Sequence, residues 1–433
     1  MGHYFGTDGI RGKAYDYLNF DLAFRVGRSL KLLSLETLVI GRDTRESGEM
    51  LVDAIKQGAK ISGIDVLDIG IVSTPVLSYI SQIQKSLGVM ITASHNPYHD
   101  NGIKVFLQGK KLFEEEENVI ELFLDGKKDL PLSTKVGHDL ESIDVLNLYK
   151  ELFNDVLVKT NFKIGLDLAN GATIFSAPFI FQQMTDNLFL IGNHPDGRNI
   201  NQSVGSTHIE TILQFVQSNQ LDFGISFDGD GDRLIVVDSH SNVYDGDYLL
   251  YVMALYLENQ NLLKHHKVAL TKMSNLGIIK ALEKHGIEVI QTNIGDKYIF
   301  EALEKNNIIL GGENSGHIIN KILLNTGDGV LNAAFLIKIL FETNQSLQEI
   351  TSSIKMYPDK LVNLHHVNRD LVQHEEVLFK VNEIKEILGS DGKILVRASG
   401  TEPLIRISVS AKTEKEVDNY IQLIVSIIDR LNH

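Results

Sequence analysis

Short apolar runs alternate with amphipathic segments along most of this chain. Runs such as TLVIG (37–41) and GVMIT (88–92) have the length and composition of buried strands, and between such runs the apolar residues recur at helical spacing. We expect strands at 37–41, 65–70, 88–92, 188–192, 223–227, 267–271, 288–292 and 308–312, and helices at 207–219, 247–258, 275–285 and 297–305. This alternation predicts parallel or mixed sheets covered by helices.

The alternation also divides the chain. It recurs in three blocks, 1–150, 151–250 and 251–360, although the identity between blocks is too low to establish a repeat from residues alone. From 361 to 433 the pattern is strand, helix, strand, loop, strand and helix, which predicts a smaller α+β domain. A length of 433 residues is too long for a single core, so we expect three consecutive α/β domains and a fourth, smaller one.

Composition narrows the class of protein. Hydrophobic residues make up 43% and charged residues 22%, as in ordinary globular proteins. The absence of cysteine excludes disulfides, a thiolate nucleophile and a cysteine zinc site. The start, MGHYFGTDGIRG, lacks a signal-peptide pattern, and the longest apolar runs, such as 248–257, are shorter than the ~20 residues of a membrane span. We therefore expect a cytoplasmic protein without a membrane partner.

The net charge of −15 argues against nucleic acid as a partner, because phosphate backbones attract basic surfaces. An anionic substrate would need a local cluster of basic residues to overcome the field of the whole protein.

The strongest chemical signal is DGDGDR at 228–233, between two strand-like runs. Three carboxylates at alternate positions, separated by glycines, can converge on one divalent cation, and hard oxygen ligands favour Mg²⁺ or Ca²⁺. An EF-hand is excluded, because its sixth position would be Arg233 instead of glycine and its twelfth Ser239 instead of glutamate.

Two further motifs are ambiguous when taken alone. RASGTEP at 397–403 offers hydroxyls, backbone N–H groups and arginine, which together suit a phosphate, but an ordinary hairpin loop would also fit. GGENSGH at 311–317 carries groups that suit a polyhydroxy ligand, although, taken alone, this stretch is better explained as a capping loop before a helix.

Ser94 follows a buried strand in ASHNP, beside His95. Its surroundings do not match G-x-S-x-G, so they do not indicate an acyl-transfer nucleophile. No P-loop or kinase glycine-rich motif is present, so ATP is not the evident phosphoryl donor. A metal loop, a phosphate loop and a hydroxyl-binding loop together favour phosphoryl transfer to a sugar, with Ser94 itself carrying the phosphoryl group.

Read in order, these motifs resemble the series that marks the α-D-phosphohexomutases: FGTDGIRG (5–12), TASHNP (92–97), DGDGDR (228–233), GENSGH (312–317) and RASGTEP (397–403). More narrowly, DNGIK (100–104), PDGRNIN (195–201), GSTH (205–208) and TGDG (326–329) are similar to the bacterial phosphoglucosamine mutases. The resemblance covers almost the whole chain. It implies four domains around a central cleft: a phosphoserine domain (1–150), a metal-loop domain (151–250), a sugar-binding-loop domain (251–360) and a phosphate-clamp domain (361–433).

The resemblance also implies roles for residues. Ser94 corresponds to the phosphoserine, which shares one Mg²⁺ with Asp228, Asp230 and Asp232. The positions around the transferring phosphoryl group correspond to Arg11, His95, Lys104 and Arg233. The sugar-binding positions correspond to Glu313, Asn314, Ser315 and His317, and the phosphate clamp to Arg397, Ser399, Gly400, Thr401 and Arg406. The basic residues among these, with Lys297, would supply the local positive charge that an anionic substrate needs.

The expected reaction interconverts glucosamine 6-phosphate and glucosamine 1-phosphate through a 1,6-bisphosphate, feeding the synthesis of UDP-N-acetylglucosamine and cell-wall precursors. His95 and Lys104 are both candidates for the general base, and the kinase or bisphosphate donor that first phosphorylates Ser94 is not indicated. The alternatives are a phosphomannomutase/phosphoglucomutase with the same chemistry, a Mg²⁺-dependent sugar phosphatase and a non-catalytic sugar-phosphate sensor. Two positions depart from the family pattern: Asn314 stands where glutamine is usual, and Lys272 where a small or apolar residue is usual.

Overall fold

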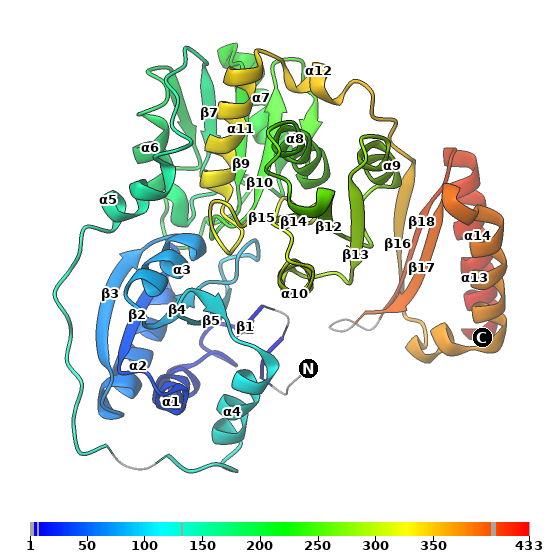
Figure 1. Cartoon of the computed structure of the whole chain (residues 1–433). Coiled ribbons are helices and arrows are strands. Elements are labelled where there is room, and N and C mark those ends of the chain that lie inside the picture. The colour runs from blue at the N-terminus through cyan, green and yellow to red at the C-terminus, as the bar shows by residue number, and fades with distance from the viewer. Residues whose placement is uncertain (1–3, 7, 131–132, 400–403, 433) are drawn as a thin grey trace. The chain divides into compact units, whose positions relative to one another are not determined.

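The computed structural model describes residues 4–6, 8–130, 133–399 and 404–432. Its chain forms two compact units (Figure 1). The larger comprises Met1–Lys272 with Val289–Thr351, and the smaller comprises Met273–Glu288 with Ser352–His433. Of the four sheets that the described residues form, three belong to the larger unit.

The first sheet has the strand order β1-β5-β4-β2-β3, with β6 paired to β5. Its strands are β1 (Ile10–Lys13), β2 (Thr37–Arg42), β3 (Asp65–Ile71), β4 (Leu87–Ile91), β5 (Asp100–Leu107) and β6 (Lys110–Lys111). Its helices are α1 (Phe20–Ser29), α2 (Gly48–Ile61), α3 (Thr74–Ile83) and α4 (Glu114–Leu124). All five residues of β4 are buried, as expected for a central strand covered on both faces.

The second sheet has the order β11-β10-β9-β7-β8, and the third β13-β12-β14-β15. The second contains β7 (Ile164–Asp167), β8 (Leu188–Ile191), β9 (Phe223–Phe227), β10 (Leu234–Asp238) and β11 (Val243–Tyr244), with helices α5 (Val145–Lys150), α6 (Ser176–Phe181) and α7 (Ile209–Asn219). The third contains β12 (Lys267–Thr271), β13 (Glu288–Thr292), β14 (Leu310–Gly312) and β15 (Ile318–Asn320), with helices α8 (Gly246–Asn259), α10 (Asp296–Asn306), α11 (Gly329–Thr343) and α12 (Leu347–Thr351). Helix α9 (Leu276–Lys284), which follows β12 in the chain, belongs to the smaller unit.

The three sheets share one plan. In the first sheet, β1 lies outside this plan, because it pairs antiparallel with β5. Among the other strands of each sheet, the first and third in chain order (β2 and β4, β7 and β9, β12 and β14) pair in parallel, and the third continues through a hairpin into an antiparallel fourth strand. The second strand lies on the other side of the first. The structure thus contains a threefold repeat of topology that sequence identity did not reveal. The three hairpin loops contain TASHNP, DGDGDR and GENSGH respectively.

The smaller unit has an antiparallel sheet of order β16-β18-β17, formed by β16 (Asp359–His365), β17 (Lys393–Ala398) and β18 (Leu404–Ser410). Its helices α13 (Glu375–Leu388) and α14 (Glu414–Asn432) pack against this sheet around a core that includes Ile384, Ile407 and Ile424. The prediction of three α/β domains with mixed sheets and a smaller C-terminal α+β domain is confirmed. The strand expected at 308–312 is shorter than predicted, because β14 begins at Leu310.

Candidate active site

Ser94 lies in the hairpin loop between β4 and β5, and only 1% of it is exposed. Its backbone has a φ of +52°, in the left-handed region that residues other than glycine seldom adopt. The Ser94 hydroxyl donates a hydrogen bond of 2.6 Å to Asp228 Oδ2 in the second sheet's hairpin. The side chain therefore points away from its own sheet and into the DGDGDR loop.

The DGDGDR loop approaches Ser94 closely enough to exclude side chains. A Cβ atom on Gly229 would lie 2.5 Å from the Ser94 carbonyl oxygen, and Gly231 has a φ of +74°. These glycines explain why the three aspartates alternate with residues that have no side chain. The loop is also held by Thr74 at the start of α3, whose backbone N–H donates to the Asp230 carbonyl at 2.9 Å.

Asp228, Asp230 and Asp232 are all buried, and one oxygen from each lies within 4.8 Å of the others. Burial, followed by repulsion from Asp232 and Asp230, raises the pKa of Asp228 to about 8. Among the described residues, Asp230 Oδ1 and Asp232 Oδ1 accept no hydrogen bond. Buried carboxylate oxygens without donors are costly, and a divalent cation would satisfy them. The residues thus fit a divalent metal site.

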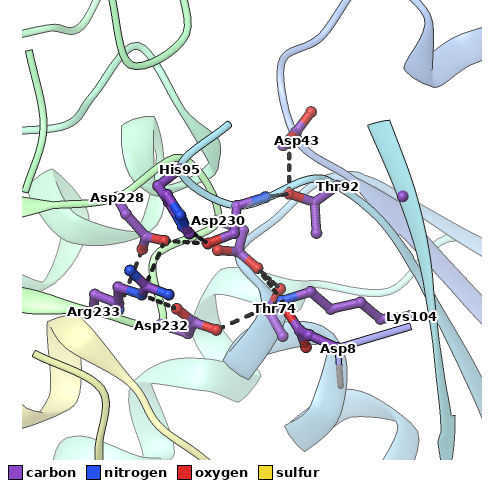
Figure 2. Close-up of polar contacts among 12 residues, drawn as sticks. Asp8, Asp43, Thr74, Thr92, His95, Lys104, Asp228, Asp230, Asp232 and Arg233 are labelled. Atoms are coloured by element: carbon purple, nitrogen blue, oxygen red, sulfur yellow. Dashed lines mark hydrogen bonds and ion pairs between the residues drawn. The ribbon is translucent and has the colours of Figure 1, made fainter. Parts of the chain in front are cut away.

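Lys104 from β5 is the cation at the centre of this cluster, and 2% of its side chain is exposed. Its Nζ lies 2.8 Å from Asp230 Oδ2, 2.9 Å from Asp8 Oδ2 and 3.6 Å from Asp232 Oδ2. Burial alone would lower the pKa of Lys104, but these three carboxylates raise it well above its usual range. Figure 2 shows Lys104, Asp8 and the three aspartates converging from different segments of the chain.

Arg11 and Arg233 flank the same group of carboxylates. Arg11 forms an ion pair with Asp8. Arg233 Nε lies 3.9 Å from Asp228 Oδ2 and 4.0 Å from Asp232 Oδ1 (Figure 2). These two arginines and Lys104 offset the negative charge of the carboxylates and place N–H donors, which suit a phosphate, at the same site.

His95 is the nearest imidazole to Ser94. Its Nδ1 lies 3.3 Å from Ser94 Oγ. Burial, and then the charges of Arg233 and Arg11, lower the pKa of His95 to about 4. Its ring is consequently neutral near pH 7.

The third sheet's hairpin brings His317 to the aspartates. His317 Nδ1 lies 3.5 Å from Asp232 Oδ2, and the backbones of Arg233 and His317 form an antiparallel bridge. Burial would lower the pKa of His317, but Asp232 and Asp296 outweigh it and raise that pKa. The loops of the second and third sheets are therefore joined through their backbones as well as through charge.

The remaining residues of GENSGH differ in their surroundings. Glu313 Oε1 accepts a hydrogen bond of 2.9 Å from the Gly295 N–H. Ser315 Oγ is buried and has no hydrogen-bond partner among the described residues. The Asn314 residue is exposed, and its backbone carbonyl accepts a hydrogen bond from the Gly246 N–H at 3.1 Å. The tip of this loop is thus fixed by its backbone, while the Asn314 side chain is accessible.

Lys272, which departs from the family pattern, also lies at the carboxyl ends of this sheet's strands. Its Nζ donates to Asn293 Oδ1 at 2.9 Å, and its backbone N–H donates to the Thr292 carbonyl at 3.0 Å. This residue therefore links the segments that follow β12 and β13.

In the smaller unit, Arg397 on β17 and Arg406 on β18 are direct cross-strand partners. Such partners share one face of the sheet, and like charges placed opposite each other are unfavourable unless an anion lies between them. Burial and the charge of Arg406 lower the pKa of Arg397. Ser399 is buried, and its carbonyl accepts from Arg369 NH1 at 3.2 Å. The predicted clamp residues Gly400 and Thr401 lie outside the described residues.

Sequence reasoning missed several residues around Ser94. Asp8 pairs with Lys104, Lys111 and Arg11, and these cations hold its pKa well below the usual range although burial acts to raise it. A buried pair, Asp43 and Arg45, lies directly beneath the Ser94 loop. The available signal was position, because GRDTRESG (41–48) begins within β2, and β2 pairs in parallel with β4, the strand that precedes the Ser94 loop.

The chain belongs to the phosphoglucomutase/phosphomannomutase family. Family models of its α/β/α domain I match residues 2–129, those of domain II residues 146–241, those of domain III residues 245–357, and those of the C-terminal domain residues 361–427. A relative from Anoxybacillus flavithermus, named phosphoglucosamine mutase, is 42% identical over 99% of both chains.

No helix among the described residues has the length and apolarity needed to cross a membrane.

Two solved structures share the fold. A phosphoglucomutase/phosphomannomutase family protein from Burkholderia thailandensis is 21% identical with a TM-score of 0.80, covering 98% of this chain and 97% of the other. The N-acetylphosphoglucosamine mutase of Aspergillus fumigatus, solved in complex with GlcNAc-6P and magnesium, is 17% identical with a TM-score of 0.66, covering 99% and 96%.

Proposed function

We propose that this protein is a phosphoglucosamine mutase, an isomerase that interconverts glucosamine 6-phosphate and glucosamine 1-phosphate. The observation that carries the proposal is the Ser94 hydroxyl, buried and directed at Asp228 within a cluster of three carboxylates. A relative named for this activity is 42% identical over the full length. A simple hydroxyl-binding or structural role would not require a strained serine in contact with an acidic metal-type loop.

The proposed reaction has two phosphoryl transfers, with Ser94 as the carrier. In the first, the bond between phosphorus and Ser94 Oγ breaks and a bond from phosphorus to the sugar O1 forms; the O1 proton passes to a nearby base, which returns a proton to Ser94 Oγ. The product is the 1,6-bisphosphate. In the second, the bond from phosphorus to O6 breaks, Ser94 Oγ gives up its proton and takes that phosphoryl group, and O6 receives the proton.

Because one fixed serine serves two sugar oxygens, the bisphosphate must turn around between the two transfers. His95 and Lys104 both remain candidates for moving the proton. His95 Nδ1 lies 3.3 Å from Ser94 Oγ, and Lys104 reaches the same carboxylate cluster from the other side.

Asp228, Asp230 and Asp232, together with Ser94, would hold one Mg²⁺. When bound, this ion would neutralise charge on the phosphoryl oxygens during in-line transfer. A phosphoserine carries about −1.5 to −2 charges, so the dication and the phosphoryl group together leave the charge of the site nearly unchanged. Lys104, Arg11 and Arg233 would stabilise the equatorial oxygens through charge-assisted hydrogen bonds. The magnesium in the A. fumigatus mutase supports this choice of ion.

The sugar would bind to Glu313, Ser315 and His317, which present a carboxylate, a hydroxyl without a hydrogen-bond partner in the described part of the chain, and an imidazole. The opposing guanidinium groups of Arg397 and Arg406 suit the phosphate that is not reacting. We propose that these arginines, with Ser399, Gly400 and Thr401, form the phosphate clamp. The domain boundaries 1–150, 151–250, 251–360 and 361–433 are proposed with these roles.

A phosphomannomutase/phosphoglucomutase is the second candidate, because Asn314 replaces the glutamine usual in phosphoglucosamine mutases and its side chain is exposed on the sugar-binding loop. The two candidates share every step of the chemistry and differ only in the sugar.

The test is ³¹P NMR of purified protein with Mg²⁺, a catalytic amount of glucose 1,6-bisphosphate, and glucosamine, glucose or mannose 6-phosphate in turn. We expect the 1-phosphate of glucosamine to form fastest. Ser94→Ala should abolish all three conversions without unfolding, because it removes only the carrier oxygen. Intact-mass measurement should show one added phosphate in part of the wild type and none in the variant. Full turnover by Ser94→Ala would refute the phosphoserine, and faster turnover of glucose or mannose phosphate would favour the second candidate.

A further inference from the structure

Arg45 directs its whole guanidinium group at the loop that carries Ser94. The residue is 1% exposed, and each of its five N–H donors has an acceptor. Nε donates to Asp43 Oδ2 at 2.9 Å, and the other four bonds go to backbone carbonyls, those of Ser94, Asn96, Pro97 and Asp100. No other kind of side chain could supply this set of donors.

Asp43 and Thr92 complete the support from the same sheet. Asp43 Oδ1 accepts from the Arg45 backbone N–H at 3.0 Å, and Asp43 Oδ2 accepts from Thr92 Oγ1 at 2.7 Å. Thr92 Oγ1 in turn accepts from the Ser94 N–H at 2.9 Å. Both backbone polar groups of Ser94 are therefore fixed by one buried network, at a residue whose φ of +52° is intrinsically unfavourable.

A second donor reaches the same carbonyls from the region of the second sheet. Asn201 Nδ2 donates to the Ser94 carbonyl at 2.9 Å and to the Asn96 carbonyl at 3.2 Å. The segment that contains Asn201 is attached to the Arg45 loop, because the Glu46 N–H donates to the Gly197 carbonyl at 2.9 Å. The loop of the first sheet is thus held to the second by the same atoms that hold Ser94 in place.

We propose that Arg45 is a positioning residue for the phosphoryl carrier, with Asn201 as its counterpart from the second sheet. Together they hold the Ser94 backbone in its left-handed conformation, so that Oγ stays directed at Asp228 in both transfers. This inference rests on the proposed mutase function. Arg45 contacts backbone atoms of the loop, so its effect on transfer is exerted entirely through Ser94.

Positioning predicts a specific kinetic result. Arg45→Lys keeps a positive charge beside Asp43 but supplies at most three N–H donors, so some loop carbonyls lose their hydrogen bonds. A displacement of the reacting oxygen by about 1 Å can slow transfer by roughly 100-fold. We therefore expect kcat to fall about 100-fold while KM for glucosamine 6-phosphate changes less than about twofold. Asn201→Ala removes one amide donor and should lower kcat by about 3- to 10-fold, again with KM unchanged.

Each variant has a matched control. Arg42→Lys makes the same exchange three residues earlier, at a partly exposed arginine that pairs with Glu49 at 2.9 Å. Asn219→Ala makes the same exchange at an exposed asparagine at the end of α7. Both should keep wild-type kcat. Single-turnover phosphorylation of Ser94 by glucose 1,6-bisphosphate, followed by intact mass after rapid quenching, should slow by the same factor as kcat in the Arg45 and Asn201 variants.

Hydrogen exchange provides a readout that does not depend on activity. In folded Arg45→Lys, amides of residues 92–102 should exchange faster, while those of β2 and β9 keep wild-type protection. Unchanged exchange in this loop, wild-type kcat in both variants, or a rise in KM alone would overturn the positioning role. If Arg45→Lys does not fold, the hydrogen exchange, kcat and KM of Asn201→Ala test the positioning role in the same way. A wild-type protein that neither accepts the phosphoryl group nor turns over refutes the mutase function, and the exchange result still decides whether Arg45 orders the loop.

Discussion

Replacing Lys104 by methionine would remove the cation that three buried carboxylates share. The methionine side chain has nearly the length of the lysine stem, so the apolar packing of β5 is largely kept and the ammonium group is the principal loss. In the native protein this group lies 2.8 Å from Asp230, 2.9 Å from Asp8 and 3.6 Å from Asp232. Asp8 retains Arg11 and Lys111 after the substitution, whereas Asp230 loses the one cation that lies within 4 Å of it among the described residues.

The size of the expected loss in stability follows from the burial of this ion pair. Removing one partner of a buried ion pair typically costs about 3–5 kcal/mol, because a charge is left without compensation in a site of low polarity. The larger unit spans well over two hundred residues, for which each kcal/mol shifts the melting temperature by about 2 °C. In EDTA, we therefore expect the Lys104→Met variant to melt roughly 6–10 °C below the wild type.

Magnesium should reverse part of this loss. In the wild type, Mg²⁺ at Asp230 Oδ1 would share this carboxylate with the Lys104 ammonium on Oδ2 and be repelled by it, whereas in the variant it meets an uncompensated carboxylate. Each tenfold gain in affinity adds about 1.4 kcal/mol of stability at a given saturating Mg²⁺ concentration, or roughly 3 °C here. The melting temperature of the variant should thus rise by at least 3 °C more than that of the wild type between EDTA and 10 mM Mg²⁺, while turnover stays strongly impaired.

The assay is differential scanning calorimetry with and without Mg²⁺, combined with hydrogen exchange of β4–β5 and β9–β10 peptides, because two compact units can unfold separately. Lys297→Met is the matched control. Lys297 makes a partly exposed pair with Glu117 at 3.3 Å, which is worth less than about 1 kcal/mol. Equal Mg²⁺ shifts in the Lys104 variant and the wild type, or melting within 2 °C of the wild type in EDTA, would refute the reasoning.

Three further predictions concern the metal, the sugar and the clamp. Asp230→Asn should weaken Mg²⁺ binding by calorimetric titration and lower activity in parallel, because one of three anionic ligands becomes neutral; full activity in excess chelator would contradict the metal assignment. Asn314→Gln should keep activity and raise the ratio of kcat/KM for glucosamine over glucose phosphate, since a longer amide on an exposed loop tip reaches further; identical ratios would remove the basis of this claim. Arg397→Ala should start at a measurable rate, decay within a few turnovers as weakly held bisphosphate escapes, and recover when 1,6-bisphosphate is added, because each lost charge-assisted hydrogen bond is worth roughly 1.5–3 kcal/mol. Linear progress curves without a bisphosphate response would show that Arg397 is not the clamp.

The fold was largely predictable from local pattern. Strands such as β4 and β9 are short continuous apolar runs ending in polar turns, and each lies within one or two residues of its prediction. The threefold repeat was not predictable, because topology constrains which faces are apolar but leaves the identity of each apolar residue free. Three blocks can therefore share one strand order with little sequence identity.

The candidate site was predictable only where chemistry is concentrated in one stretch. DGDGDR places three carboxylates within five residues, so its ability to bind a metal is visible in the sequence. Arg45 is different, because its importance depends on carbonyl groups some fifty residues away and backbone carbonyls leave no trace in a sequence. Asp8 was hidden for a related reason, since its three cationic partners come from β1, β5 and β6.

Because the three sheets share one plan, positions in their three hairpin loops can be matched to one another. Counting from the last residue of the strand that precedes each hairpin (β4, β9 and β14), Ser94, Asp230 and Ser315 each occupy the third position of the loop that follows. Duplication of one ancestral unit would leave such a trace, in which the same site on one backbone diverged into a hydroxyl, a carboxylate and a second hydroxyl. Each loop connects two strands of its own sheet. A substitution within residues 312–317 can therefore alter the third loop without disturbing the strands that carry the other two. Changes of sugar preference in this lineage are therefore expected to be concentrated in the third hairpin, while the first two stay nearly constant.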